Sequence, residues 1–99
     1  MILEVAVFEI KPGSESAFEE GVRKAAPLFK SAKGCRSMKV QRSIEHPSRY
    51  TLFVQWETLE DHTETFRSSE NFQQWRALVG ACFASAPDVQ HLKMAVDNF

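Results

Sequence analysis

The chain begins with an almost uninterrupted run of apolar residues from Ile2 to Ile10. Successive side chains of a β-strand point to opposite faces of its sheet. One face carries Leu3, Val5 and Val7, and the other carries Ala6, Phe8 and Ile10. Because both faces are apolar, the pattern predicts a strand at the centre of a sheet, covered on both sides. Lys11-Pro12-Gly13 ends this strand.

A helix with one apolar stripe is predicted next. Its apolar residues recur at helical spacing: Phe18, Val22, Ala25 and Phe29. Ser14 or Ser16 caps its start, and Ser16 with Glu19 has the spacing of a capping box. Pro27 predicts a kink or a restart, because proline removes a backbone hydrogen bond. Gly34 lies just past the end, where a left-handed cap favours glycine.

Two strands follow, joined by a turn at His46-Pro47-Ser48-Arg49. Residues 35–45 alternate between apolar and polar, with Met38, Val40 and Ile44 facing one way. This alternation predicts an edge strand or one with a wetter face. Residues 50–57 are apolar on both faces, which predicts a second central strand.

The last third predicts a pair of helices and a final strand. Thr58 opens a short helix with Asp61 as its capping partner, and Ser69 caps a second helix. The second helix is predicted to carry one apolar stripe: Phe72, Trp75, Val79 and Phe83. Ala86-Pro87-Asp88 interrupts the chain, and residues 89–96 are predicted to form the last strand.

The predicted order is therefore strand, helix, strand, strand, helix pair, strand. This β-α-β-β-α-β order is typical of the α+β ferredoxin-like fold with an antiparallel four-stranded sheet. The usual strand order, 4-1-3-2, places the first and third strands in the centre, in agreement with their apolar faces. We expect residues 1–99 to form a single domain, because the length is ordinary for one and no repeat or linker interrupts it.

Charge and composition argue against several kinds of partner. Twelve Lys and Arg against thirteen Asp and Glu leave a net charge of −1, so no basic excess is present to bind nucleic acid. No apolar run reaches the roughly 18 residues of a membrane span. Glu4 interrupts the first apolar stretch, so no signal peptide is predicted and the cytoplasm is the expected location. Cys35 and Cys82 lack CxxC spacing and are expected to be reduced.

Polar side chains that suit a ligand site lie between Trp56 and His91. His62 is predicted near the inward face of its helix, where a neutral imidazole needs a hydrogen-bond partner or a wet pocket. His91 shares a strand face with Val89 and Lys93, and it converges with His62 if that face looks toward the helices. Two histidines without a third ligand do not form a metal site, so no metal is expected.

Arg67 and Trp75 add a cation and an indole donor to the same region. Arg67 ends its helix, where a cation complements the helix terminus, and it is alternatively a clamp for a substrate carboxylate or phenolate. Trp75 belongs to the apolar stripe, but its indole N–H needs a partner when buried. The other aromatic residues of the region are expected to pack, some of them lining a cleft: Trp56, Phe66, Phe72 and Phe83.

Several short motifs occur in order along the chain: Lys11-Pro12-Gly13, Lys33-Gly34-Cys35, IEHPSRY leading into VQWETLEDH, and FRSSENFQQW. With these motifs the chain resembles the antibiotic biosynthesis monooxygenase (ABM) domain family over nearly its whole length. The resemblance implies a homodimer of ferredoxin-like subunits forming an α+β barrel, with a cleft between sheet and helices in each subunit. Activities in the family include cofactor-independent oxygenation of polycyclic phenols and quinols, haem degradation and isomerisation of metabolites, and some members have no known activity.

The haem-degrading branch uses an asparagine, a tryptophan and a histidine at positions that here hold Ala6, Phe66 and Arg76. Haem degradation is therefore set aside. The oxygenating members use an asparagine, a tryptophan and a tyrosine, whereas the only tyrosine of this chain, Tyr50, begins a strand. This sequence thus departs from both residue sets.

The resemblance leads to the hypothesis of a cofactor-independent monooxygenase acting on a small phenol-like or quinol-like aromatic compound. His62 would be the base, and Arg67 or Trp75 would stabilise the oxyanion. The substrate-binding residues would be Trp56, Phe66, Phe72, Phe83 and His91. No glycine-rich dinucleotide motif occurs, so no cofactor is implied. Two alternatives stay open: a non-catalytic ligand-binding or stress-associated barrel protein, and an isomerase or lyase in which His62 shuttles a proton.

Overall fold

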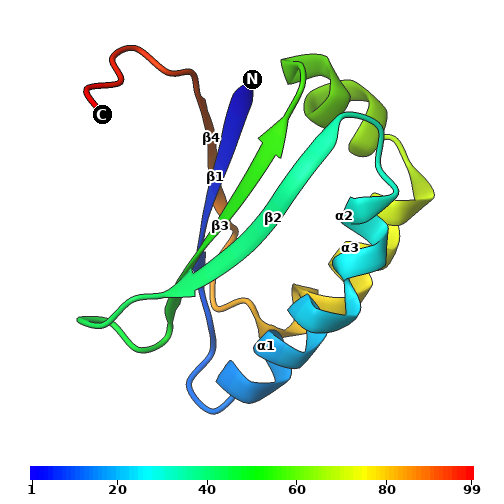
Figure 1. The fold of residues 1–99 in the computed structure, drawn as a ribbon. Helices are drawn as coiled ribbons and strands as arrows, with labels where there is room; N and C mark the ends of the chain where they lie inside the picture. The colour runs from blue at the N-terminus through cyan, green and yellow to red at the C-terminus, as the bar shows by residue number, and fades with distance from the viewer.

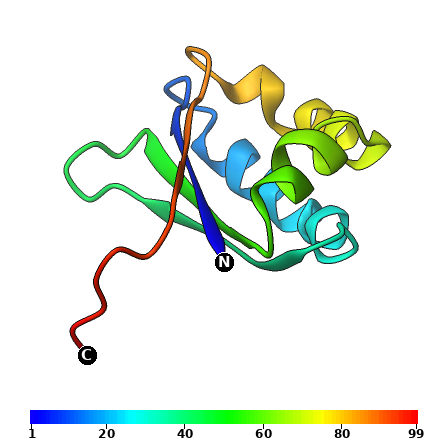
Figure 2. The ribbon, with the colours of Figure 1, turned by 90° about the horizontal axis from the view of Figure 1, so that it is seen from above.

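The computed structural model describes residues 1–99 and arranges them in two layers, a sheet and a set of helices (Figure 1). The strands are β1 (Ile2–Glu9), β2 (Cys35–Arg42), β3 (Arg49–Trp56) and β4 (Asp88–Leu92). The helical segments are α1 (Glu15–Lys24), α2 (Ala26–Lys30), η1 (Asp61–Phe66), α3 (Glu70–Val79) and η2 (Gly80–Cys82). The helices all lie on one face of the sheet, which leaves the opposite face uncovered (Figure 2).

The sheet is antiparallel, with the strand order β2-β3-β1-β4. This is the predicted order read from the other edge, and it confirms the ferredoxin-like fold. The central strands bury the side chains that face the helices: Ala6, Phe8, Tyr50, Leu52, Val54 and Trp56. On the other face of β1, Leu3, Val5 and Val7 are only half-buried. The prediction that β1 is covered on both sides therefore holds for one side only in the single chain.

β2 lies at one edge of the sheet, as its polar face predicted. Met38 and Val40 pack partly against the core. Ile44, which was expected on the same inward face, lies beyond the end of the strand and is 90% exposed. The inward face of β2 is therefore shorter than the alternation in the sequence indicated.

The first helical segment is interrupted near Pro27, as predicted. α1 ends at Lys24 and α2 begins at Ala26, with Pro27 in its first turn, where a missing N–H leaves no helical bond unmade. Ser14 is at the N-cap position without a side-chain hydrogen bond, and Ser16 lies inside the helix, so the predicted capping box does not form. The helices cover the sheet with the predicted stripe, but none is long and apolar enough to cross a membrane.

Two predictions for the last third are wrong in detail. The last strand is β4, and residues 93–99 form neither helix nor strand, so the strand predicted over residues 89–96 is too long. Phe83 does not continue the α3 stripe, because α3 ends at Val79 and η2 follows. Phe83 instead pairs with Ile10 in an isolated β-bridge, which brings it to the sheet by a different route.

Candidate functional site

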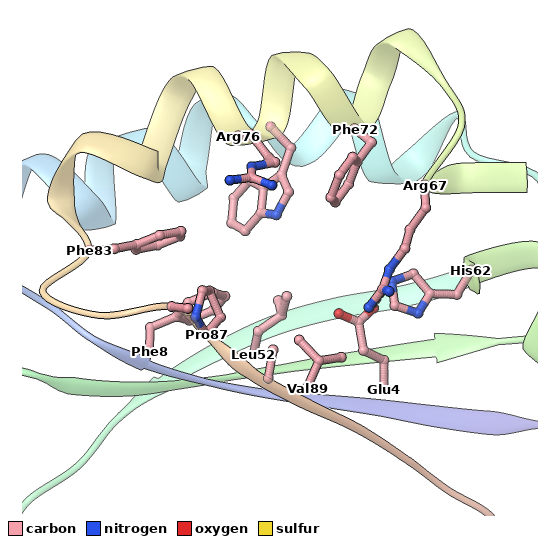
Figure 3. Close-up of a pocket in the computed structure, with 13 residues that line it drawn as sticks. Glu4, Phe8, Leu52, His62, Arg67, Phe72, Arg76, Phe83, Pro87 and Val89 are labelled. Carbon is pink, nitrogen blue, oxygen red and sulfur yellow. Dashed lines mark ion pairs between the residues drawn. The ribbon is translucent and has the colours of Figure 1, made fainter. Parts of the chain in front are cut away.

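A cavity of about 430 Å³ lies between the sheet and α3 (Figure 3). The sheet supplies Ala6, Phe8 and Leu52, and α3 supplies Phe72 and Trp75 on the opposite side. Eight of the thirteen lining residues are hydrophobic, which favours a ligand that is mostly apolar. Such a cavity needs only a few polar groups to orient what it binds.

The main polar end of the cavity is built around Glu4, which is 5% exposed. Figure 3 shows Glu4, His62 and Arg67 together at this end. The indole N–H of Trp56 donates to Oε1 of Glu4 over 3.0 Å, and Nε2 of His62 lies 3.3 Å from the same oxygen. The Trp56 and His62 rings stack with 5.2 Å between their centroids. These partners offset the cost of burying a carboxylate.

His91 completes this group from the neighbouring strand. It lies directly opposite Glu4 in the pairing of β1 with β4. Its Nε2 atom is 2.7 Å from Nδ1 of His62, which confirms the prediction that the two histidines converge if their faces meet. We call Glu4, Trp56, His62 and His91 the Glu4 cluster. No group of three His, Cys, Asp or Glu side chains in residues 1–99 is placed to hold a metal ion.

The contacts of the Glu4 cluster assign a tautomer to each histidine when Glu4 is ionised. An ionised carboxylate only accepts hydrogen bonds, so Oε1 of Glu4 accepts from Trp56 and favours a proton on Nε2 of His62, which lies 3.3 Å away. The Nδ1 atom of His62 is then unprotonated and accepts from the Nε2–H of His91. Both ring nitrogens of His62 are therefore occupied within the chain.

Burial shifts each titratable group of the Glu4 cluster toward its neutral form. It raises the pKa of Glu4, against the opposing effects of the Trp56 hydrogen bond and the Arg67 charge. It lowers the pKa of His62 to about 4, and the charges of Arg67 and His91 act in the same direction. Burial and Arg67 also lower the pKa of His91. Both histidines are therefore neutral at neutral pH.

Arg67 follows η1 directly and lines the cavity. Its side chain extends from the helical layer toward Glu4 and His62 (Figure 3), yet it forms no salt bridge within the chain. Arg76 also lines the cavity, with its guanidinium carbon 6.0 Å from the centre of the Phe72 ring. Guanidinium groups beside an apolar cavity suit a ligand that carries or develops negative charge.

η1 holds His62 in place with a π-helical turn. The N–H of Arg67 donates to the carbonyl oxygen of His62, five residues earlier, over 3.1 Å. At the start of the segment, Oγ1 of Thr58 accepts from the N–H of Asp61 over 3.1 Å, as the capping pattern predicted. Asp61 is buried and packs against Gly34, whose φ of +77° confirms the predicted left-handed position. The start of the turn is thereby anchored.

The remaining predicted site residues fall into two groups. Phe72 and Phe83 line the cavity, whereas Trp56 and Phe66 pack beside it in the core without lining it. Trp75 lines the cavity, and its indole nitrogen makes no hydrogen bond within the chain. Because no fully buried side-chain nitrogen lacks a partner, the Trp75 N–H has access to solvent and is available to a ligand.

Glu4 is the residue of this site that the sequence analysis missed as a functional group. Its position in β1 has the same parity as Ala6, Phe8 and Ile10, so alternation alone places it on the face that the helices cover. A carboxylate on a buried face requires partners. This combination was the signal available in the sequence, where Glu4 was considered only as an interruption of an apolar run.

The fold and the cavity define a class of small α+β proteins in which a ferredoxin-like sheet and its helices enclose a cavity. Within this class, the model of the family described as antibiotic biosynthesis monooxygenase (ABM) matches residues 1–78. The chain belongs to this family, which confirms the resemblance found in the sequence. His91 lies beyond the matched residues, so the family match covers only part of the Glu4 cluster.

Known proteins resemble the chain over almost its whole length. The Bacillus subtilis protein YczJ, described as uncharacterized, is 41% identical over 93 residues, covering 94% of this chain and 98% of YczJ. A Bordetella bronchiseptica crystal structure named for the same family is 49% identical, covers 96% of this chain and 97% of that one, and has a TM-score of 0.94. SnoaB, a cofactor-independent oxygenase from Streptomyces nogalater, is 14% identical, covers 97% of this chain and 94% of that one, and shares the fold with a TM-score of 0.83.

Proposed function

We propose that the chain binds a small, mostly apolar aromatic compound in this cavity and oxygenates it without a cofactor. The observation that carries the proposal is the buried Glu4 cluster at the end of an otherwise apolar cavity. A buried acid and a neutral histidine are groups that take a proton from a bound substrate. Family membership and the name of SnoaB support the type of chemistry.

A quinol or an anthrone supplies its own electrons in such a reaction. The Glu4 cluster removes a proton, and the electron-rich anion that remains reduces dioxygen to a peroxide bound to the substrate. For an anthrone, a CH₂ group becomes a carbonyl: one oxygen atom enters the product, and the other leaves as water with the two hydrogen atoms. Arg67 and the indole N–H of Trp75 line the cavity and stabilise the oxyanion.

Oxygen uptake with a panel of quinols and anthrones tests the proposal. We expect one dioxygen consumed per product molecule, and a rate that falls by about 100-fold or more in His62→Ala. His46→Ala is the matched control, because His46 is an exposed histidine in the β2–β3 turn. Binding of the same compounds without uptake would sink the oxygenase and leave a ligand-binding protein. Conversion without uptake would identify an isomerase or lyase.

We also propose that two chains pair through the uncovered face of the sheet. Leu3, Val5, Val7 and Phe53 are half-buried there, and Leu92 is 46% exposed. Apolar surface of this kind marks an interaction site when it is contiguous. The mass in solution at micromolar concentration should be twice the 11.3 kDa of one chain. Val5→Lys should give monomers, whereas Ala17→Lys, on the exposed side of α1, should remain dimeric. A monomeric unmodified chain would refute the pairing.

A further inference from the structure

We propose that Glu4 is the group that receives the substrate proton, and that His62 and Trp56 are positioning residues that hold it. The inference rests on the proposed function, because it assigns the first step of that reaction to one atom. It differs from the sequence-based hypothesis, in which His62 is the base. The distinction comes from which atoms of the Glu4 cluster are still free to contact a ligand.

The two carboxylate oxygens of Glu4 have different surroundings. Oε1 accepts the hydrogen bond from Trp56 and contacts His62, whereas Oε2 has no hydrogen-bond partner in the chain. No fully buried side-chain oxygen lacks a partner, so Oε2 is not sealed in the core. Since Glu4 lines the cavity, we infer that Oε2 faces it. Figure 3 shows the Glu4 side chain rising from β1 with its carboxyl group at the cavity end.

His62, in contrast, has no free basic nitrogen. Its Nε2 faces Glu4 and its Nδ1 faces His91, so neither lone-pair position is open to a substrate. One face of its ring stacks on Trp56, and the whole residue is only 3% exposed. Taking a substrate proton directly would require His62 to break one of these contacts. A direct base must reach the proton within hydrogen-bond distance.

The protons and electrons balance with Glu4 alone. The C–H bond of an anthrone breaks, its proton bonds to Oε2 of Glu4, and the electron pair stays on the substrate as an enolate. The peroxide formed with dioxygen takes this proton back. Loss of the second C–H proton, together with hydroxide from the peroxide, then gives the carbonyl and water, and Glu4 ends ionised as it began. No outside reductant is needed.

Proton removal can be measured without oxygen. In D₂O under anaerobic conditions, the unmodified chain should catalyse hydrogen–deuterium exchange at the acidic carbon of an anthrone, followed by NMR. Glu4→Gln should slow this exchange by about 100-fold or more, because the amide is a very weak base. Glu20→Gln, an exposed glutamate on α1, should leave the rate unchanged. Circular dichroism shows whether each variant is folded.

Conservative variants separate a base from a positioning residue. His62→Gln keeps an N–H group in place of the ring nitrogen that lies 3.3 Å from Glu4, so we expect exchange within about tenfold of the unmodified rate, whereas His62→Ala should lose more. Trp56→Phe removes a hydrogen bond that favours the ionised carboxylate, so the exchange rate should depend on a higher apparent pKa. The apparent pKa of the exchange reaction also depends on the other titratable or charged groups near Glu4: His62, Arg67, His91, Arg76 and Cys35.

The outcomes distinguish this inference from the proposed function. Exchange that survives Glu4→Gln but not His62→Gln overturns the assignment even if oxygen uptake is confirmed. Exchange that depends on Glu4 without any oxygen uptake supports the assignment and refutes the oxygenase. Absence of exchange in the unmodified chain overturns the assignment whatever the oxygen measurement shows.

Discussion

Replacing Gly34 with alanine should destabilise the turn that carries His62. Gly34 has a φ of +77°, in the region that favours glycine over other residues. A Cβ atom at this position would lie 2.6 Å from Cγ and 3.0 Å from Cβ of Asp61, the first residue of η1. Asp61 is 5% exposed and lies 3.9 Å from Nζ of Lys33. The new methyl group therefore has to push a buried carboxylate aside.

Two contributions set the size of the effect. The left-handed backbone costs an alanine roughly 1–2 kcal/mol. Displacing a packed side chain costs a further 1–3 kcal/mol or so. We therefore expect Gly34→Ala to lower the free energy of unfolding by about 3 kcal/mol. Gly13 is the matched control, because its φ is +92° but a Cβ there meets no atom within 4 Å. Gly13→Ala should lose only the backbone contribution, about 1–2 kcal/mol.

Urea unfolding at 25 °C, followed by tryptophan fluorescence and circular dichroism, measures both losses. Asp61→Ala gives a second check, because it removes the side chain that the methyl group meets. Gly34→Ala should cost about 1–2 kcal/mol less in the Asp61→Ala background than alone. Equal losses at Gly34 and Gly13, to within about 0.5 kcal/mol, would refute the reasoning. The reasoning would also be refuted if the losses of unfolding free energy caused by Gly34→Ala and Asp61→Ala were strictly additive.

Three further predictions concern titratable groups. The pKa of His62 is lowered from 6.5 to about 4, so its contribution to stability is complete above pH 6.5 and falls by about 3 kcal/mol as the pH drops toward 4. The raised pKa of Glu4 has the opposite effect on stability, so urea unfolding of the unmodified chain must be compared with that of His62→Gln across this pH range. Parallel plots of stability against pH for the two proteins would contradict the prediction. Trp56→Phe should lower the free energy of unfolding by about 2–3 kcal/mol at neutral pH, measured by the same method. The loss should be smaller in acid, where Glu4 is protonated, and a loss that does not change with pH would argue against the hydrogen bond. Burial and the hydrogen bond to Glu19 raise the pKa of Tyr50, the only tyrosine, to about 12, which ultraviolet titration measures. A pKa near 10 in a chain that circular dichroism shows to be folded would refute this.

The order of the elements followed from local patterns, because strand polarity and the positions of Pro27 and Gly34 depend only on nearby residues. The end of α3 did not follow in this way. Phe83 fits a helical spacing, but its pairing with Ile10 draws it into the sheet. That contact joins residues far apart in the sequence, and local periodicity does not include it. β4 likewise ends at Leu92, opposite Leu3 near the start of β1, and this pairing is not visible in the local pattern.

The candidate site was predictable in part for the same reason. His62 and His91 were recognised individually, but their convergence depended on which face of β4 meets the helices. The strand register answers this by placing His91 opposite Glu4. The partners of Glu4 could not be predicted from the sequence either, because Trp56 and His62 reach its carboxylate from β3 and η1. The sequence pattern gives the residue types, but it does not show that β1, β3 and η1 bring these side chains into contact.

The π-helical turn of η1 marks the place where a relative could lose one residue and still keep the site. Its hydrogen bond from Arg67 to His62 spans five residues, whereas an α-helical bond spans four, so the turn holds one residue more than an ordinary helix. Deleting one residue between these positions would let an α-helical bond form and would leave His62 and Arg67 on nearly the same side of the segment, because each kind of bond closes about one turn. A relative with a one-residue gap here would keep the fold and both side chains in its sequence. It would also keep the orientation of His62, whereas a gap in an ordinary helical stretch would rotate the residues before it by about 100°, so the position of a gap, as well as residue identity, distinguishes relatives that can share the site.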